Sequence, residues 1–192
     1  VGAIPGAGIV KGQAVARWLN NKFGKATFEQ TRMTLIMVAY DLCQHQEIVL
    51  GQGPIAPAVY QSIALPGILP PVTAPGRMIV DGGVLNPLPV SVLVNMGVKK
   101  IIAVNVLLPA HPLPSGQASA RQVAVIPDVI VRSLQVSQDV LAQTSGRQAN
   151  VLITPDLKGV EWFELDKARQ LIRAGYDAAQ QQMPAIKALL GS

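Results

Sequence analysis

An aspartate at position 81 ends an apolar run and is followed by two glycines, within the stretch from Arg77 to Val90 that reads RMIVDGGVLNPLPV. An acid at the end of a strand can cap the turn that follows, and Gly82 and Gly83 could supply a turn with positive φ. The same carboxylate could also act as a general base, if a hydroxyl lay within hydrogen-bond reach and burial raised its basicity. Asp-Gly-Gly alone favours the turn.

Three other groups of residues could take part in chemistry. His111 follows an apolar run and could complete a Ser-His-Asp triad with Asp81, although a histidine between prolines is more typical of a solvated loop. His45 and Cys43 share one short turn, but two ligands are too few for zinc. Asp41 also ends an apolar run, so it could line the same cleft as Asp81 or cap its own turn. We expect no metal and no cofactor.

The spacing of apolar residues predicts the elements that must position these groups. Helices are expected at residues 15–23, 57–64, 89–96, 127–144 and 165–190, the last kinked or divided by Pro184. Strands are expected at residues 33–42, 47–53, 78–84, 99–108 and 150–157. Residues 109–120 have the composition of a mobile loop. This order of elements predicts an α/β layered sheet in a single domain over residues 1–192.

The composition fits a compact protein with a large core. Apolar residues make up 49% of the 192 positions and aromatic residues only 4%, so the core must consist mainly of Val, Ile, Leu and Ala, as in buried parallel strands. The net charge is +5, but the cations are scattered, so no nucleic-acid partner is expected. No apolar run reaches the roughly 18 residues of a membrane span. We expect a soluble or membrane-peripheral protein, with the cytoplasm favoured.

Several segments between about Gly8 and Leu107, in the same order, resemble the later half of a patatin-like phospholipase domain. They are GIVKGQAVARWL, KATFEQTRMTLIMVAYDL, GPIAPAVYQSIALPGILPPV and VDGGVLNPLPV, and the late LIRAGYDAA is similar to the family's terminal helix. VDGGVLNPLPV is close to the family's Asp-Gly-Gly signature with its Asn-Pro tail. The resemblance implies a three-layer α/β/α patatin-like sheet, related to the α/β-hydrolases.

The resemblance also implies a serine hydrolase with a Ser-Asp dyad, in which Asp81 matches the family's aspartate. The implied substrates are lipids or esters, as in phospholipases A, lysophospholipases and esterases, and peripheral contact with a membrane surface is expected. A candidate acyl-pocket wall, which could equally be plain core, consists of Ile63, Leu65, Pro66, Gly67, Ile68 and Leu69.

The nucleophile that such a dyad needs is not in this sequence. None of the eight serines stands in a Gly-x-Ser-x-Gly elbow. We therefore expect that the N-terminal part of the domain is missing, that it is the partner of this chain, and that the chain alone is inactive. A half-sheet of this kind should expose an edge strand and apolar surface. The alternative is a catalytically silent α/β scaffold or interaction domain derived from a hydrolase.

Overall fold

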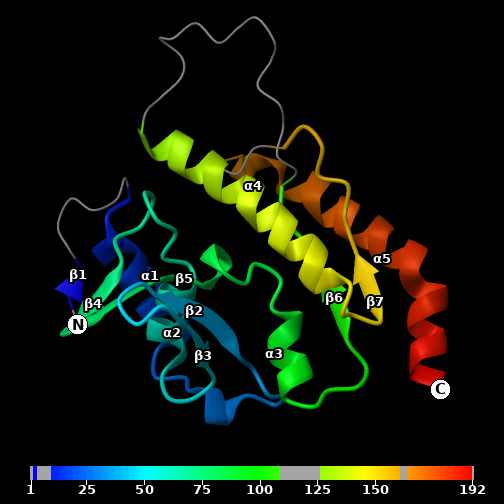
Figure 1. The fold of residues 1–192 in the computed structure, drawn as a ribbon, viewed down its shortest axis with the longest axis horizontal. Coiled ribbons are helices and arrows are strands. Elements are labelled where there is room, and N and C mark those ends of the chain that lie inside the picture. The colour runs from blue at the N-terminus through cyan, green and yellow to red at the C-terminus, as the bar shows by residue number, and fades with distance from the viewer. Residues whose placement is uncertain (1, 4–9, 109–125, 161–163, 192) are drawn as a thin grey trace, which may run out of the picture. The chain divides into compact units, whose positions relative to one another are not determined.

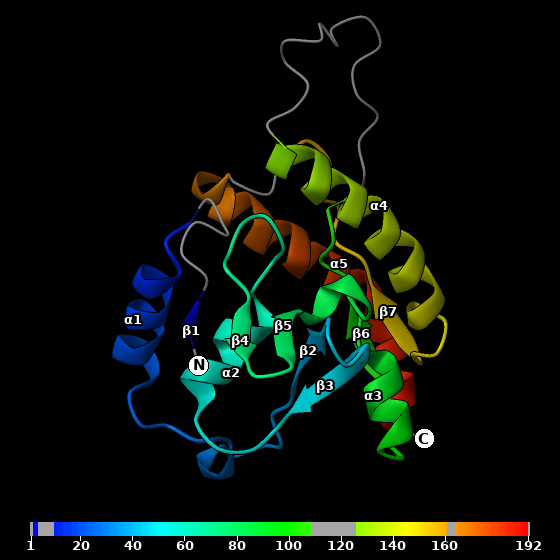
Figure 2. The ribbon, with the colours of Figure 1, turned by 60° about the vertical axis from the view of Figure 1, so that its left-hand side comes forward.

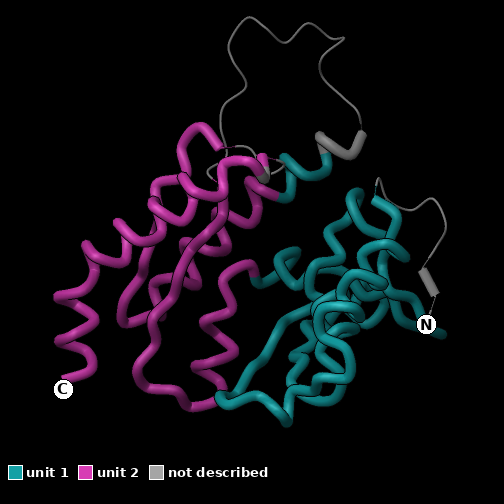
Figure 3. The backbone as a smooth tube through the Cα atoms, turned by 180° about the vertical axis from the view of Figure 1, so that it is seen from behind, with its two compact units in different colours: residues 1–86, 116–134 teal, residues 87–115, 135–192 magenta. Residues whose placement is uncertain are grey.

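The computed structural model describes residues 2–3, 10–108, 126–160 and 164–191. Contacts divide the chain into two compact units, shown in teal and magenta in Figure 3. Unit 1 comprises Val1–Asn86 and Gly116–Leu134, and unit 2 comprises Pro87–Ser115 and Gln135–Ser192. The single domain expected over residues 1–192 stays a prediction.

Unit 1 contains a five-stranded sheet in the order β1-β4-β5-β2-β3. The strands are β1 (Gly2–Ala3), β2 (Met37–Asp41), β3 (Gln46–Leu50), β4 (Val72–Ala74) and β5 (Arg77–Asp81). All pairs in this sheet are antiparallel. The short turns that join β2 to β3 and β4 to β5 require this direction for those two pairs. The aliphatic composition had suggested parallel strands, and among the described strands only those of unit 2 are parallel. The pairing of β2 with β5 brings the two strands that end in aspartates together.

Two helices cover the sheet of unit 1. Helix α2 (Ile55–Ser62) packs against β2 and β5, and α1 (Gly12–Phe23) packs against α2 (Figures 1 and 2). Helix α1 ends at Gly24, which has φ 55° and whose N–H bonds to the carbonyl of Asn20. The buried residues between helices and sheet form two clusters: Leu19, Ala56, Tyr60 and Ala64, and Phe28, Ile55 and Ala58. A short 3-10 helix (Phe28–Gln30) precedes β2, and another (Gly82–Val84) follows β5.

Unit 2 contains a two-stranded parallel sheet with helices around it. Its elements are α3 (Val90–Asn95), β6 (Ile102–Val104), the later part of α4 (Ile126–Gly146), β7 (Val151–Ile153), a 3-10 helix (Leu165–Lys167) and α5 (Ala168–Gly191). One face packs Ala103 of β6 with Ala142 of α4, and the other packs Val151 and Ile153 of β7 against Ala178 of α5. Helix α5 passes Pro184 without being divided.

The α/β fold class predicted from the sequence is confirmed. The predicted helices are all present, but all five predicted strands are shorter than expected. β2 begins at Met37 because its partner β3 ends at Leu50, and β6 has only the three residues that pair with β7. Strand β4 was not predicted, since Val72–Ala74 lies in a proline-rich segment that gives no alternating pattern. The loop expected at residues 109–120 lies outside the described residues.

Candidate functional site

Asp81 is the last residue of β5 and the first residue of a tight turn. In the antiparallel register it lies opposite Ala39 of β2. On its other side, its N–H donates to the carbonyl of Ala64 at 3.0 Å, beyond the point where β4 pairs with β5. Asp81 then caps the 3-10 helix at Gly82–Val84. The backbone of this residue is therefore held from both sides within the sheet.

The carboxylate of Asp81 is half-buried and keeps acceptor capacity. Its Oδ1 accepts a hydrogen bond from the N–H of Gly83 at 2.7 Å, and no other bond to its carboxylate comes from the described residues. The second carboxylate oxygen, Oδ2, accepts no hydrogen bond from the described residues. It is therefore open to solvent, because every buried side-chain oxygen in the described structure has a partner. Burial raises the pKa of Asp81, and the bond from Gly83 opposes this only in part. Burial thus makes this carboxylate more basic than an exposed aspartate, while its role as a general base stays a prediction.

The two glycines serve a different purpose from the one expected. Neither Gly82 nor Gly83 has positive φ, so the prediction of a left-handed turn is wrong. Instead, a Cβ at Gly82 would lie 2.6 Å from both the carbonyl carbon and the oxygen of Val38 in β2. A side chain at position 82 is therefore excluded by the backbone of the neighbouring strand, while the N–H of Gly83 caps the carboxylate.

Asn86 closes the turn after Asp81, a role that sequence reasoning missed. Its backbone N–H donates to the carbonyl of Gly82 at 2.8 Å, and its buried side chain donates Nδ2–H to Oε1 of Glu47 at 2.6 Å. Glu47 belongs to the edge strand β3, so this bond ties the turn to the far side of the hairpin. The only signal was the Asn-Pro step inside the motif, which carries no information about its partner.

The candidate acyl-pocket wall adjoins Asp81 through the backbone of Ala64. Next to it, the N–H of Ile68 donates to the carbonyl of Leu65 at 3.0 Å, across Pro66 and Gly67. Gly67 has φ 84°, so these four residues form a turn with proline and glycine in the positions that a type II turn favours.

The side chains of this wall divide into two sets. Ile63 is 40% exposed, whereas Ile68 and Leu69 are buried in a cluster with Val131, against which Leu65 packs. Part of the wall is thus core, and its role in binding an acyl chain stays a prediction. A separate pocket of about 350 Å³ is lined by Phe28, Arg32, Gly51 and their neighbours and contains none of the predicted residues.

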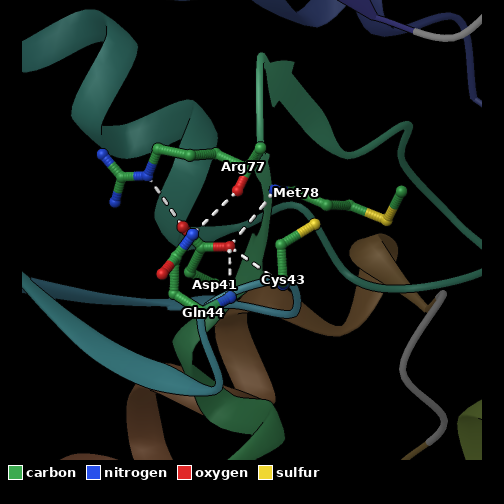
Figure 4. Close-up of polar contacts among 6 residues, drawn as sticks. Asp41, Cys43, Gln44, Arg77 and Met78 are labelled. Atoms are coloured by element: carbon green, nitrogen blue, oxygen red, sulfur yellow. Dashed lines mark hydrogen bonds and ion pairs between the residues drawn. The ribbon is translucent and has the colours of Figure 1, made fainter.

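Asp41 has the turn-capping role that was one of its two expected roles. Its side chain is fully buried, and its Oδ1 accepts the backbone N–H groups of Cys43 (3.0 Å), Gln44 (3.3 Å) and Met78 (3.2 Å). Its Oδ2 accepts Nε–H of Arg77 at 2.7 Å (Figure 4). The Arg77 guanidinium is the main cause that lowers the pKa of Asp41 to about 2, and the three amides add to it against the effect of burial.

The remaining candidates contribute no site in the described part of the chain. Cys43 and His45 are exposed in the β2–β3 turn, where His45 has φ 51°. The described residues hold no group of three side chains that could bind a metal ion. His111 lies outside them. No helix within these ranges is both long and apolar enough to cross a bilayer.

Comparison with known proteins gives a consistent result for the first half of the chain. Residues 2–94 match the model of the patatin-like phospholipase family. An uncharacterized NTE family protein of Mycobacterium tuberculosis is 30% identical over 143 residues, which cover 74% of this chain and 39% of that protein. The lysophospholipase NTE1 of Meyerozyma guilliermondii is 53% identical over 45 residues, 23% of this chain and 3% of that protein.

A third relative extends the comparison to an animal protein. The neuropathy target esterase sws of Drosophila melanogaster is 27% identical over 104 residues, which are 53% of this chain and 7% of that protein. The chain therefore spans well under half the length of each of these relatives. The match to the family model includes Asp81, Gly82, Gly83 and the wall segment.

Proposed function

Because residues 2–94 of this chain belong to the patatin-like phospholipase family, we propose that it is part of a serine-type lipid acyl hydrolase in which Asp81 is the base of a Ser-Asp dyad. The observation that supports this most directly is the state of the Asp81 carboxylate. It is fixed at the end of a strand, its pKa is raised by burial, and one of its oxygens receives no hydrogen bond from the described residues. These are the properties that a carboxylate needs to accept a proton from a serine hydroxyl.

In the proposed mechanism, an oxygen of Asp81 takes the proton of a serine hydroxyl as that hydroxyl attacks the ester carbonyl. Collapse of the tetrahedral intermediate breaks the ester bond, and the proton on Asp81 passes to the leaving alcohol. Water then attacks the acyl-serine, again losing a proton to Asp81, and the fatty acid leaves as the serine is restored. The bond from Gly83 keeps one carboxylate oxygen oriented throughout.

The serine must come from outside these 192 residues. No serine of the chain lies in a Gly-x-Ser-x-Gly elbow, which the family uses to expose its nucleophile at a tight strand-to-helix turn. We propose that the preceding part of the same domain provides both the elbow and the oxyanion loop, and that the chain alone is inactive.

The proposed substrate class is an acyl ester of a lipid. The relatives carry the names lysophospholipase and esterase, which supports phospholipids, lysophospholipids or simpler esters as substrates for this chain's parent protein. The mechanism needs no metal, since the base, the nucleophile and the oxyanion donors are all protein groups.

A silent scaffold is the second candidate, and the missing serine favours it. If no polypeptide supplies the elbow, Asp81 has no proton to accept, and the chain would retain only the α/β fold and its surfaces for binding. The two functions differ in one observable property, which is reaction with a serine-directed probe.

The deciding experiment labels two proteins with a fluorophosphonate. One is the 192-residue chain, and the other is the full translated product of the gene that encodes it. We expect the longer protein to be labelled, and to release fatty acid from lysophosphatidylcholine, while the 192-residue chain is not labelled. Labelling of the short chain would contradict the need for an outside serine, and a longer protein that neither reacts nor hydrolyses esters would establish the scaffold.

A further inference from the structure

Helix α1 lies on the outside of unit 1 (Figure 2). It carries exposed aromatic side chains among cations. Trp18 is 58% exposed and Phe23 is 37% exposed. The exposed cations on this helix and at its two ends are Lys11, Arg17, Lys22 and Lys25. An exposed tryptophan beside lysines is the combination found where helices lie on a lipid headgroup layer.

The spacing places Trp18 and Lys22 on one side of the helix, and Lys11 and Lys25 flank its two ends. Lys22 follows Trp18 by four, which is the spacing of neighbours on one helical face, whereas Lys11 is the N-cap residue and Lys25 comes after Gly24, where the helix has ended. The Nζ of Lys22 lies 5.9 Å from the centre of the Trp18 ring. We call these four residues the α1 basic strip. Leu19, which is 2% exposed, faces the core instead.

Within the described residues, no acid forms an ion pair with the strip. The first acidic residue of the sequence is Glu29. Helix α5 provides the contrast, since its exposed Tyr176 also has a cation near the ring, at 5.7 Å from Arg173. There, however, Arg173 is paired with Asp177 at 2.9 Å. Compared with the Arg173–Tyr176 pair of α5, the α1 basic strip therefore has positive charge available for an anionic partner.

We propose that the α1 basic strip docks on an anionic phospholipid surface. Tryptophan rings settle at the level of the lipid headgroups, and lysines near them reach phosphate groups with their ammonium ends while their stems cover apolar surface. Each cation near such a surface strengthens binding by about fivefold, equivalent to about 1 kcal/mol. The strip has three lysines and one tryptophan, which suits weak, reversible and salt-sensitive binding.

The position of the strip relates it to the candidate active site. Just before α1, the N–H of Val10 donates to the carbonyl of Ile68 at 3.0 Å, and Val15 of α1 packs against the cluster of Ile68 and Leu69. The same segment bonds to Asp81 through Ala64. Docking through α1 would therefore bring the segment that adjoins Asp81 close to the lipid surface. The inference deepens the proposed function. It rests on that proposal only in taking a lipid as the substrate.

The test measures binding of the 192-residue chain to vesicles by flotation. We expect it to bind phosphatidylcholine vesicles that contain about 30 mol% phosphatidylglycerol, and to bind pure phosphatidylcholine far more weakly. The double variant Lys22→Gln/Lys25→Gln should bind about 25-fold more weakly, and Trp18→Ala about tenfold more weakly. In a Trp162→Phe background, Trp18 fluorescence should shift to the blue and be quenched by brominated lipid.

Matched variants on unit 2 are the controls. Lys99→Gln/Lys187→Gln removes the same charge from exposed positions elsewhere, and Tyr176→Ala removes an equally exposed aromatic group. Both should bind like the unchanged chain. The proposal is overturned if these controls lose as much affinity as the α1 variants, if binding does not depend on the anionic lipid, or if the strip binds a single-stranded oligonucleotide but no vesicle.

This result is separable from the proposed function. Binding does not need the missing serine, so it can succeed when the longer protein proves to be no hydrolase. Conversely, the longer protein could hydrolyse a water-soluble ester while the 192-residue chain floats with no vesicle, and then only the docking surface would be disproved.

Discussion

Two aspartates lie on one pair of strands in unit 1, and their surroundings shift their pKa values in opposite directions. Asp41 of β2 is opposite Ile79, and Asp81 of β5 is opposite Ala39, so the antiparallel register places both side chains on the same face of the sheet. The pKa of Asp41 falls to about 2 from its ordinary value of 3.8, while the pKa of Asp81 is raised. Position at a strand end therefore does not determine what such an acid does.

The number and charge of the donors explain the difference. Asp41 accepts three backbone N–H groups and the guanidinium of Arg77, so its negative charge is fully compensated although no part of the side chain is exposed. In the described structure, Asp81 has only the N–H of Gly83 to offset its desolvation. The first carboxylate holds the β2–β3 turn to the start of β5, and the second keeps the raised pKa that the proposed dyad would use.

The largest expected effect is on kcat, which substitution of Asp81 should lower far more than substitution of Asp41. In the full translated product of the gene, which we propose contains the serine, Asp81→Asn should lower kcat by roughly two to four powers of ten, because the proposed nucleophile loses its base. Asp41→Asn, which leaves the base in place, should keep kcat within about tenfold when it is assayed well below its unfolding temperature. The measurement is ester hydrolysis with far-UV circular dichroism as the check on folding. Near-normal activity of Asp81→Asn would remove this residue from the mechanism.

The second effect is on stability, where the substitution of Asp41 should do more harm than the substitution of Asp81. Asp41→Asn should lower the melting temperature of the 192-residue chain by roughly 10 °C, because it leaves Arg77 without its anion and places an amide among donors. Arg77→Gln should cost less, since the three backbone bonds to Asp41 remain. A melting temperature unchanged by Asp41→Asn would show that this network does not hold the hairpin.

The pH dependence of this loss has a defined sign. A folded-state pKa below the ordinary value means that the charge of Asp41 stabilises the fold above pH 3.8 and that this contribution disappears as the pH falls towards about 2. The stability difference between the unchanged chain and Asp41→Asn should therefore be full near neutral pH and shrink across that window. A difference that is constant down to about pH 2 would contradict the lowered pKa.

The third effect concerns the backbone that positions Asp81. Gly82→Ala should destabilise the chain by about 2–3 kcal/mol, because the new Cβ would meet the Val38 carbonyl at 2.6 Å and neither backbone can move freely within the sheet. Gly175→Ala is the matched control, since it lies inside α5 with nothing within 4 Å of the new Cβ. It should stabilise by about 0.5–1 kcal/mol. Urea unfolding measures both, and equal effects would mean that Gly82 is not under steric constraint.

The sequence predicts much of the fold because local signals are strong in it. Helix α1 shows the helical period of apolar residues and is followed by a glycine. The β2–β3 hairpin consists of two apolar runs joined by a polar turn. Asp81 itself was identified from its motif and its resemblance to a family. These features depend on neighbours a few residues away, which a sequence displays directly.

The environment of the two acids could not be predicted in the same way. Arg77 and Met78 reach Asp41 from 36 and 37 positions along the chain, and Glu47 reaches Asn86 from 39 positions. The constraint on Gly82 comes from Val38 in another strand, although the sequence had suggested a local reason, positive φ. Nothing in the order of residues marks which acid will be given donors and which will be left with one.

The smallest expected effect tests the contrast at Asp81 itself. Because burial raises the folded-state pKa of this carboxyl, its charged form destabilises the fold, and that cost appears as the pH rises from below 3.8 through the raised value. Asp81→Asn should therefore raise the melting temperature near neutral pH by about 2–4 °C, with no gain in strong acid, where both side chains are neutral. An amide oxygen can still accept the N–H of Gly83. If the variant instead melted lower near neutral pH, Asp81 would stabilise its turn as Asp41 does, and its charge would have a structural explanation that needs no serine.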